Sequence, residues 1–529
     1  MRPRLRVAPA TGVVLASLLL TTGGGPAATA AAAGASTLKV TTIGRDGSAV
    51  PGSLLQILDA RTRMRTGPWG ESGRSISLPA GQYIVVSDIV EPDGDDQTLG
   101  AAVVTVSGAT SVTLDARKGK PVTTSLDVPG IGTADITEAI CVDGVPADEP
   151  TDLTGAGPAG HVHVIPNASS LLRFAYLARW ENAGPEETYA VTGATVGVPA
   201  NPGGVHHAKD LAVEHVQSNV GPNQGTSQDL SFVPQGSPCQ ARLRTTSFSN
   251  FDGRAPYTYT AHLEAGKWDV RSDEICQTGS CGTFHGVHAL AAGTSYSQTF
   301  HRAGWGPARV LPTMAHGEIT FSVNNMFQDP YTAGFEFGSR TRVTLSRDGR
   351  QLATQTVIGN YRGGGPSFFQ AAAKGSGWYT LDAYATRYQP GITYPADMLT
   401  PSTRAVFRFH ADPRTAQVAP GVLGRFLIGG LDSRSRAKPH STTPVGLFMD
   451  RADPHAGVPY KTDTAKTVQA WYSTDNGKNW HGLRVTHSGS TWSTSVPNPA
   501  EAKVSLSTKV TDAAGNSVQT YSNQAYAVR

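Results

Sequence analysis

A short segment near the middle of the chain holds the residue types of a hydrolase site. Residues 285–288 read HGVH, and residues 293–295 read GTS. A histidine can act as general base for a serine nucleophile when an acidic side chain orients the imidazole. The segment HGVHALAAGTSYS (285–297) is therefore either catalytic or a piece of strand and turn that contains catalytic residue types.

The spacing argues against catalysis by His285 and Ser295. In subtilisin-like proteases the motif of the histidine, similar to HGTHVAG, lies far in sequence from the motif of the serine, similar to GTSMA. A third motif, Asp followed by Thr or Ser and Gly, orients the imidazole. Here the two motifs are adjacent, Tyr296 follows the serine, and neither DTG nor DSG occurs in the chain. The alternation along 284–289 instead predicts two strands joined by a turn.

Charge and composition narrow the class of protein. The 529 residues carry a formal net charge of +3, and only 16% of them are charged. Setting aside Arg2, Arg4 and Arg6 leaves a net charge of about zero. A protein that binds nucleic acid or anionic membranes through its overall charge needs a basic face. We therefore expect no nucleic-acid partner.

The N-terminus has the layout of a secretory signal peptide, expected over residues 1–30. Arginines at its start precede the apolar run GVVLASLLL (12–20), and Ala28-Thr29-Ala30 is a plausible cleavage site. The apolar run is too short to span a bilayer, and no later run is long enough. These features predict a secreted, extracellular protein without membrane insertion.

The rest of the chain is patterned for strands. In SLLRFAYLARWENA (170–183) aromatic residues recur with a period of two, which favours a strand over a helix. Asp-Gly or Asn-Gly dipeptides in 43–50, 345–352 and 472–480 predict tight hairpins. We expect an all-β chain of tandem β-sandwiches. The expected units cover residues 37–122, 123–305 (with all four cysteines), 306–415 and 425–529.

The cysteine count favours disulfides. Cys141, Cys239, Cys276 and Cys281 form an even set, which in an exported chain predicts two bridges out of three possible pairings. Cys276 and Cys281 flank the turn-like QTGS, so a hairpin could bring them within bridging distance. Cys141 would then pair with Cys239. The alternative, a zinc site, has only the weak C-x4-C spacing in its favour.

Four aromatic residues are expected to have structural roles. Tyr83, Trp268 and Tyr296 each follow an Ala-Gly turn that leads into an alternating strand. An aromatic ring in this position caps the corner of a sandwich core, and a tyrosine hydroxyl can bond to backbone just upstream. Residues 473–480, STDNGKNW, have the shape of an Asp-box, in which the Asp closes a hairpin and Trp480 packs beneath it.

Candidate metal sites are weak, and we expect no cofactor. His161, His163, His206, His207 and His215 could start a copper or zinc site, but a polar strand face explains them more simply. Asp93, Asp95 and Asp96 in EPDGDDQ lack the spacing and final Glu of an EF-hand loop. YRGGGPS (361–367) has no Lys-Ser/Thr after its glycines and is expected to be a plain loop.

Both ends of the chain resemble one protein family, the accessory β-domains of large actinobacterial subtilisin-like (S8) secreted serine proteases. The N-terminal part is similar to their transthyretin-like, carboxypeptidase-regulatory domain, and the C-terminal part is similar to their Ig-like domain. The segments that carry the resemblance are TLKVTTIGRDGSAVPG (37–52), SLPAGQYIVVSDI (77–89), SVTLDARKGKPV (111–122), WYSTDNGKNW (471–480) and 504–528. The catalytic domain would precede residue 37, so the resemblance implies no catalytic residue here.

Two classes of function remain. The first is a secreted, non-catalytic binding or scaffold protein whose partner is an extracellular protein, a polysaccharide or a secreted protease. The alternative is an extracellular hydrolase or metal-dependent enzyme with its site in the middle β region. Convergence of His161, His163 and His207 on one pocket would favour the enzyme, and their dispersal over a smooth sandwich would favour the binder.

Overall fold

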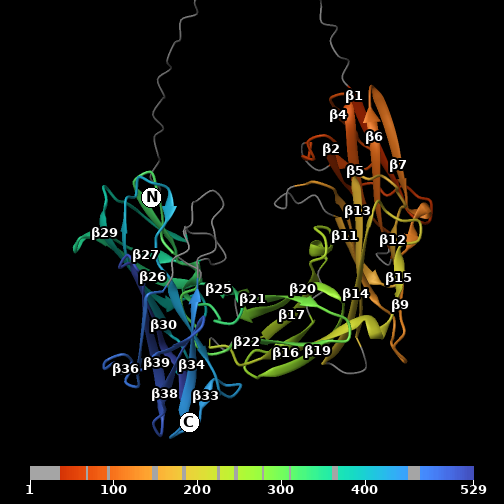
Figure 1. Cartoon of the computed structure of the whole chain (residues 1–529). Helices are drawn as coiled ribbons and strands as arrows, with labels where there is room; N and C mark the ends of the chain where they lie inside the picture. Colours follow the sequence, from red (N-terminus) through yellow and green to blue (C-terminus); the bar gives the residue numbers. More distant parts are fainter. Residues whose placement is uncertain are drawn as a thin grey trace, which may run out of the picture.

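The computed structural model describes residues 36–66, 70–91, 96–145, 153–181, 186–222, 227–243, 248–276, 279–308, 311–359, 367–450 and 465–529. The expected signal peptide lies outside these ranges. The described chain is all-β, as expected, and follows a bent path from the N-terminal sheets to the C-terminal ones (Figure 1). Its helices are short 3-10 turns: η1 (Ala116–Lys118), η2 (Ala208–Asp210), η3 (Gln240–Arg242) and η4 (Asn324–Met326).

Two sheets form the N-terminal part of the molecule. Sheet 1 has the order β4-β1-β7, with β1 (Ser36–Ile43), β4 (Ser75–Leu78) and β7 (Ala109–Asp115). Sheet 2 has the order β3-β2-β5-β6-β12-β8, with β2 (Leu54–Asp59), β3 (Gly70–Glu71), β5 (Gly81–Val90), β6 (Gln97–Val106), β8 (Lys120–Pro121) and β12 (Val162–Val164).

Two larger sheets form the middle of the molecule. Sheet 3 has the order β11-β10-β13-β14-β19-β16-β22, with β10 (Asp135–Val142), β11 (Leu153–Pro158), β13 (Leu172–Glu181), β14 (Glu187–Val196), β16 (Leu211–Ser218), β19 (Tyr257–Glu264) and β22 (Ser295–Phe300). Sheet 4 has the order β18-β17-β20-β21-β25, with β17 (Ser227–Pro234), β18 (Phe248–Asp252), β20 (Gly266–Cys276), β21 (Gly279–Leu290) and β25 (Ala333–Glu336). A separate ribbon pairs β9 (Thr123–Leu126) with β15 (Gly203–His206).

Three sheets form the C-terminal part. Sheet 5 has the order β28-β24-β23-β31, with β23 (Thr313–Ala315), β24 (Glu318–Ser322), β28 (Phe368–Ala372) and β31 (Gln417–Val418). Sheet 6 has the order β27-β26-β29-β30-β40-β39-β35-β36, and β33 adds to β40; its strands are β26 (Ser339–Arg347), β27 (Arg350–Ile358), β29 (Gly377–Arg387), β30 (Ser402–Ala411), β33 (Arg436–Ala437), β35 (Thr467–Ser473), β36 (His481–Leu483), β39 (Ala502–Thr511) and β40 (Ser517–Val528). Sheet 7 has the order β32-β34-β38-β37, with β32 (Leu423–Ile428), β34 (Thr442–Asp450), β37 (Thr486–Ser488) and β38 (Thr491–Pro497).

Sheets 1 to 4 stack in layers, and a hydrophobic core lies between each sheet and the next one. Along β5, Tyr83 and Val85 belong to the core shared with sheet 1, whereas Ile84 and Val86 belong to the core shared with sheet 3. Successive side chains of a strand point to opposite faces, so β5 is covered on both sides. Sheet 2 is therefore an inner layer and not the outer wall of an isolated sandwich.

The strand expected at 170–183 is β13, which is also covered on both faces. Phe174 and Tyr176 belong to the core between sheets 2 and 3, and Ala175 and Leu177 belong to the core between sheets 3 and 4. The period-two pattern correctly predicts a strand. The small and aliphatic residues on its second face are buried because sheet 4 lies against them.

Sheet pairing crosses all three of the expected unit boundaries. Strand β12 lies beyond residue 122 and pairs with β6 and β8 of sheet 2. Strand β25 lies beyond residue 305 and pairs with β21 of sheet 4. Strands β30 and β40, one on each side of the boundary expected at 415–425, are neighbours in sheet 6. Adjacent parts of the chain are thus joined by backbone hydrogen bonds.

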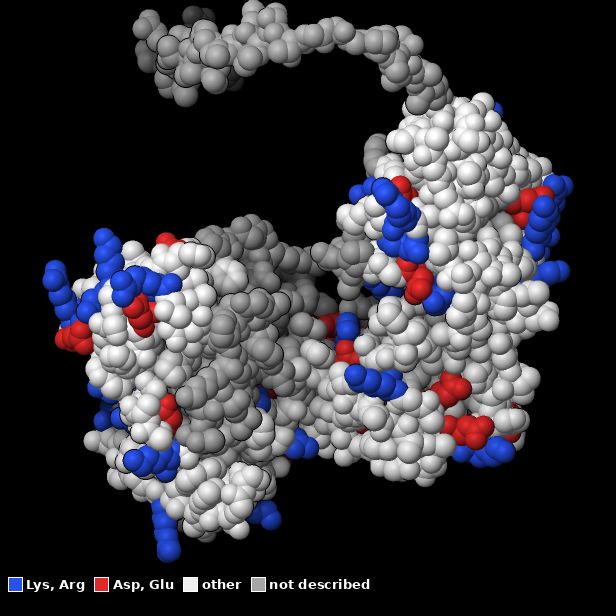
Figure 2. Space-filling view, turned by 45° about the horizontal axis from the view of Figure 1, so that its top comes forward, with Lys and Arg blue, Asp and Glu red and all other residues white. Residues whose placement is uncertain are grey.

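The surface carries no segregated charge on the face shown in Figure 2. Lys and Arg side chains lie among Asp and Glu side chains, and wide areas hold neither. Among the described residues, no helix is long and apolar enough to cross a membrane.

Candidate functional site

The segment that opened the sequence analysis consists of strand and turn, as expected. His285 and His288 lie on β21, Ser295 begins β22, and residues 291–294 connect the two strands. The strands belong to different sheets of the same sandwich, since β21 pairs with β20 and β22 pairs with β16. Ser295 is exposed, and no described hydrogen bond links it to either histidine. The arrangement is not a serine–histidine dyad.

Each histidine of this segment has its own acidic partner. His285 Nδ1 lies 3.1 Å from Asp269 Oδ1, and Arg271 lies 2.7 Å from the other oxygen of the same carboxylate. Burial alone would raise the pKa of Asp269, but the hydrogen bonds from His285 and Arg271 outweigh it and lower the pKa. Asp269 is therefore an ionised anchor for two side chains of sheet 4.

His288 points to the opposite face of β21, toward Glu214 on β16. Its Nδ1 lies 2.8 Å from Glu214 Oε2, and the Glu214 side chain is fully buried. The hydrogen bond to Glu214 raises the pKa of His288 against the opposing effect of burial. The hydrogen-bonded pair thus bridges sheets 3 and 4.

The remaining histidines do not converge on one pocket. His161 lies 2.9 Å from Asp96, and His207 lies 2.9 Å from Asp127. His163 is buried in β12, where desolvation lowers its pKa. His215 is exposed on β16. Within the described ranges, no three His, Cys, Asp or Glu side chains are placed to hold a metal ion. Asp93, Asp95 and residues 361–366 lie outside those ranges.

His206 takes part in a small network that sequence reasoning did not anticipate. Its Nε2 lies 2.9 Å from the Tyr176 hydroxyl, and its Nδ1 lies 3.1 Å from Glu264. Burial raises the pKa of Tyr176 to about 12, with a smaller contribution from Glu264. These contacts tie the β9–β15 ribbon to sheet 3.

The expected corner aromatics make the expected backbone contacts. The Tyr83 hydroxyl donates to Pro79 O at 2.8 Å, and Trp268 Nε1 donates to Glu264 O at 2.8 Å. Both rings are buried. Tyr296 is only half-buried, and its hydroxyl accepts the Ala291 N–H at 3.0 Å. The Tyr379 hydroxyl makes the same kind of bond to Gly375 O at 2.7 Å. This corner tyrosine was not predicted from the sequence, because it follows Ser-Gly and not Ala-Gly.

The Asp-box turn has the expected geometry. Asp475 accepts hydrogen bonds from Asn479 N at 2.9 Å and from the Ser473 hydroxyl at 2.7 Å. The hydrogen bond from Asn479 is the chief cause that lowers the pKa of Asp475. Trp480 packs against the turn and contacts Tyr521 edge-on, with ring centroids 5.7 Å apart. The motif is a structural hairpin at the rim of sheet 6.

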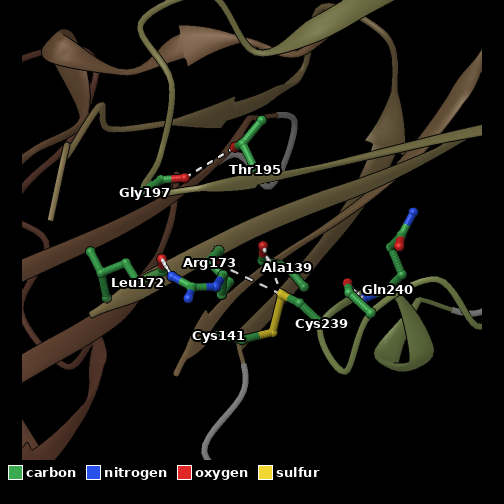
Figure 3. The surroundings of a disulfide bond; sticks show 9 residues. Ala139, Cys141, Leu172, Arg173, Thr195, Gly197, Cys239 and Gln240 are labelled. Atoms are coloured by element: carbon green, nitrogen blue, oxygen red, sulfur yellow. Dashed lines mark hydrogen bonds between the residues drawn. A yellow bond between two sulfur atoms is a disulfide. The ribbon is translucent and has the colours of Figure 1, made fainter. Parts of the chain in front are cut away.

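The cysteines form the two expected pairs, Cys141–Cys239 and Cys276–Cys281. Cys141 lies on β10, and Cys239 caps η3 in the connection from β17 to β18, so the bond ties a connection of sheet 4 to sheet 3 (Figure 3). Cys276 ends β20, and its partner lies near the start of β21, so the second bond closes a hairpin. The described chain contains no free cysteine.

A buried polar cluster lies between sheets 3 and 4, and no sequence motif pointed to it. The Ser218 hydroxyl lies 2.6 Å from Gln228 Oε1 and 2.9 Å from His301 Nδ1. All three side chains are buried, and they come from β16, from β17 and from the residue after β22. Only the pairing of distant strands brings them together.

A polar hollow lies between sheet 6 and the segment that follows β16. It has a volume of about 180 Å³. Its lining comprises Val220, Gly221, Pro222, Asp397, Met398, Leu399, Arg434, Arg436, Lys503, Ala527 and Arg529. Arg434 and Arg529 are exposed, whereas Arg436 pairs with Asp432 at 2.8 Å. The hollow therefore offers cationic groups on a concave surface. No sequence motif predicted it.

Comparisons with known proteins give no family. No family model and no curated protein matches the chain. Among solved structures, it is similar to the Bacillus anthracis TIE protein at 11% identity, with a TM-score of 0.12, over 50% of each chain. It is also similar to the FN1–FN3 domains of chicken CNTN1 at 9% identity, with a TM-score of 0.13, over 67% of this chain and 90% of that one. Scores this low carry no functional argument. The chain spans half the length of the TIE protein that it matches.

Proposed function

We propose that this protein is a secreted binding or scaffold protein that does not catalyse a reaction. The signal-like N-terminus and the disulfides support export, because disulfides persist in oxidising compartments. The resemblance of both ends of the chain to accessory domains of subtilisin-like proteases supports a non-catalytic role. The layered sheets supply a rigid support for a binding surface.

The hollow lined by Arg434 and Arg529 carries this proposal. A concave surface with several cations on a rigid support suits a ligand that bears carboxylate or similar anionic groups. Arginine is suited to such groups because its planar guanidinium donates two parallel hydrogen bonds. The proposed ligand is the acidic part of an extracellular polysaccharide or protein.

A charge-reversal experiment tests the proposal. We expect Arg434→Glu/Arg529→Glu to weaken binding to a soluble uronic-acid polysaccharide, or to poly-glutamate, by about tenfold at low salt. Lys39→Glu/Lys118→Glu makes the same charge change on two exposed residues, one on β1 and one on η1, and serves as the matched control. Equal weakening by both variants, or no binding to either probe, would contradict a role for the hollow.

The alternative, an extracellular hydrolase or metal-dependent enzyme, has no specific observation in its favour. His285 and Ser295 lie on different sheets, and His161 and His207 pair with separate carboxylates. Turnover of a peptide substrate that disappears in Ser295→Ala would nevertheless establish it.

A further inference from the structure

Ser218, Gln228 and His301 form a reactive arrangement in the core between sheets 3 and 4. Ser218 and Gln228 are 0% exposed, and His301 is 1% exposed. The Ser218 hydroxyl lies within hydrogen-bond distance of both the Gln228 carboxamide, at 2.6 Å, and His301 Nδ1, at 2.9 Å. A nucleophile, a base and an acyl group are thus in contact, and bulk water has no access to them.

The imidazole of His301 is held in place and uncharged. It stacks on Trp305 with ring centroids 5.9 Å apart, and it meets Phe284 in a T-shaped contact with ring centroids 4.9 Å apart. Burial lowers the pKa of His301 to about 3, so the ring is neutral at neutral pH and its unprotonated nitrogen can accept a hydrogen bond. Its backbone has a φ of +58°, which is unfavourable for a non-glycine residue and is common at functional sites.

The serine hydroxyl has one hydrogen and three acceptors in reach, namely Gln228 Oε1, His301 Nδ1 and, at 3.2 Å, Asn219 O. When the hydrogen of His301 is on Nε2, Nδ1 can accept the hydroxyl proton of Ser218. In the alternative orientation the hydroxyl donates to Gln228 Oε1 at 2.6 Å, which keeps the serine oxygen next to the carboxamide. Glu274, also fully buried, is the residue directly opposite Gln228 in the pairing of β17 with β20, so a carboxyl lies beside the leaving group.

We propose that Ser218 and Gln228 react to form an intramolecular ester that links sheet 3 to sheet 4. The Ser218 oxygen attacks the Gln228 side-chain carbonyl carbon while His301 takes the hydroxyl proton. The tetrahedral intermediate collapses as the carbon–nitrogen bond breaks, and the imidazolium returns the proton to the leaving amine. The products are one oxygen–carbon ester bond and one ammonia. The reaction needs no oxidant, metal or added reactant.

Mass spectrometry of the purified full chain tests this reaction. Trypsin releases residues 210–242 as one peptide, which contains both reacting residues and, after reduction, a free Cys239. We expect this peptide to be lighter by the mass of one ammonia. Backbone cleavage between residues 218 and 228 should yield no separated fragments, because the ester holds the two halves together. Alkaline hydroxylamine should open the ester and leave a hydroxamate on Gln228.

Matched variants assign the chemistry. Ser218→Ala and Gln228→Glu should abolish the loss of ammonia, Ser218→Thr should preserve it, and Ser231→Ala, which removes another buried serine of β17, should leave it unchanged. A wild-type peptide of full mass would overturn the proposal whether or not the variants fold. So would a loss of ammonia that persists in Ser218→Ala, since it would then arise from another amide.

Discussion

At the scale of single residues, Glu138 should make the stability of the fold depend on pH. Its side chain is wholly buried. It lies on β10, between sheets 2 and 3, and neither of its carboxyl oxygens has a hydrogen-bond partner among the described residues. Burial raises its pKa well above the usual value, and the nearby Asp88 adds to the shift. Gln97 Nε2 donates to Asp88 at 2.6 Å, but no described cation neutralises the two carboxyls.

The raised pKa fixes the sign of a pH effect. A group whose pKa is higher in the folded state stabilises the fold below its unfolded pKa, and this contribution is lost as the pH rises through the folded value. We therefore expect Glu138→Gln to have a higher melting temperature than the wild type at neutral and alkaline pH. The difference should vanish as the pH falls below the ordinary range of a glutamate. Thermal melts across pH measure it, with the exposed Glu71→Gln as control.

The corner aromatics should differ in their contribution to stability according to burial. Trp268→Ala should lower the free energy of unfolding by about 3–5 kcal/mol because it removes a large buried ring. Tyr83→Phe should cost only about 1 kcal/mol, since it removes one hydrogen bond and keeps the ring. Denaturant titration measures both. A Tyr296→Ala variant that kept its stability but lost a ligand would show that this half-buried ring belongs to a binding surface.

At the scale of elements, the two disulfides close loops of very different length. Cys141–Cys239 spans 98 residues, and Cys276–Cys281 spans 5. The chain-entropy model gives about 4.7 kcal/mol for the long loop and roughly 2 kcal/mol for the short one. We expect Cys141→Ser/Cys239→Ser to lower the free energy of unfolding by more than twice as much as Cys276→Ser/Cys281→Ser.

Peptide mapping without reduction provides the control for that comparison. It should recover both native pairs in the wild type and only the untouched pair in each variant. Equal losses of stability would mean that loop length does not set the effect, and that strain or residual structure in the unfolded chain does.

Short sequence patterns predicted individual strands and turns. The buried polar cluster could not be predicted in this way, because it depends on pairing between strands that are distant in sequence. Alternation marked β13 and β21 as strands, and the Asp-box marked its hairpin, because these patterns express contacts between near neighbours in sequence. Ser218 and His301 are far apart in sequence and meet only because β16 pairs with β22 in parallel. Likewise, nothing local to β12 indicates that it completes sheet 2. Register between remote strands is not encoded in short motifs.

At the scale of the whole molecule, the shared cores imply that the parts do not fold independently. Residues 37–122 alone would expose Ile84, Val86 and Leu99, which pack against sheet 3 in the intact chain. We expect this fragment to aggregate or to bind a hydrophobic dye such as ANS, and the full chain to bind little of the dye before it unfolds. A sharp, dye-free transition for 37–122 would show that the N-terminal sandwich is autonomous.

Because β12 belongs to sheet 2 but comes late in the sequence, sheet 2 stays incomplete during part of synthesis. Strand β6 is complete long before β12, which follows roughly 60 residues later and takes about 3–12 s to be made at typical rates of synthesis. During that interval, the stretch from Gln97 to Leu99 has no partner on the side that β12 later occupies. An open strand edge recruits other strands. Contact between two nascent chains would therefore begin at this edge, which the finished protein covers with its own β12.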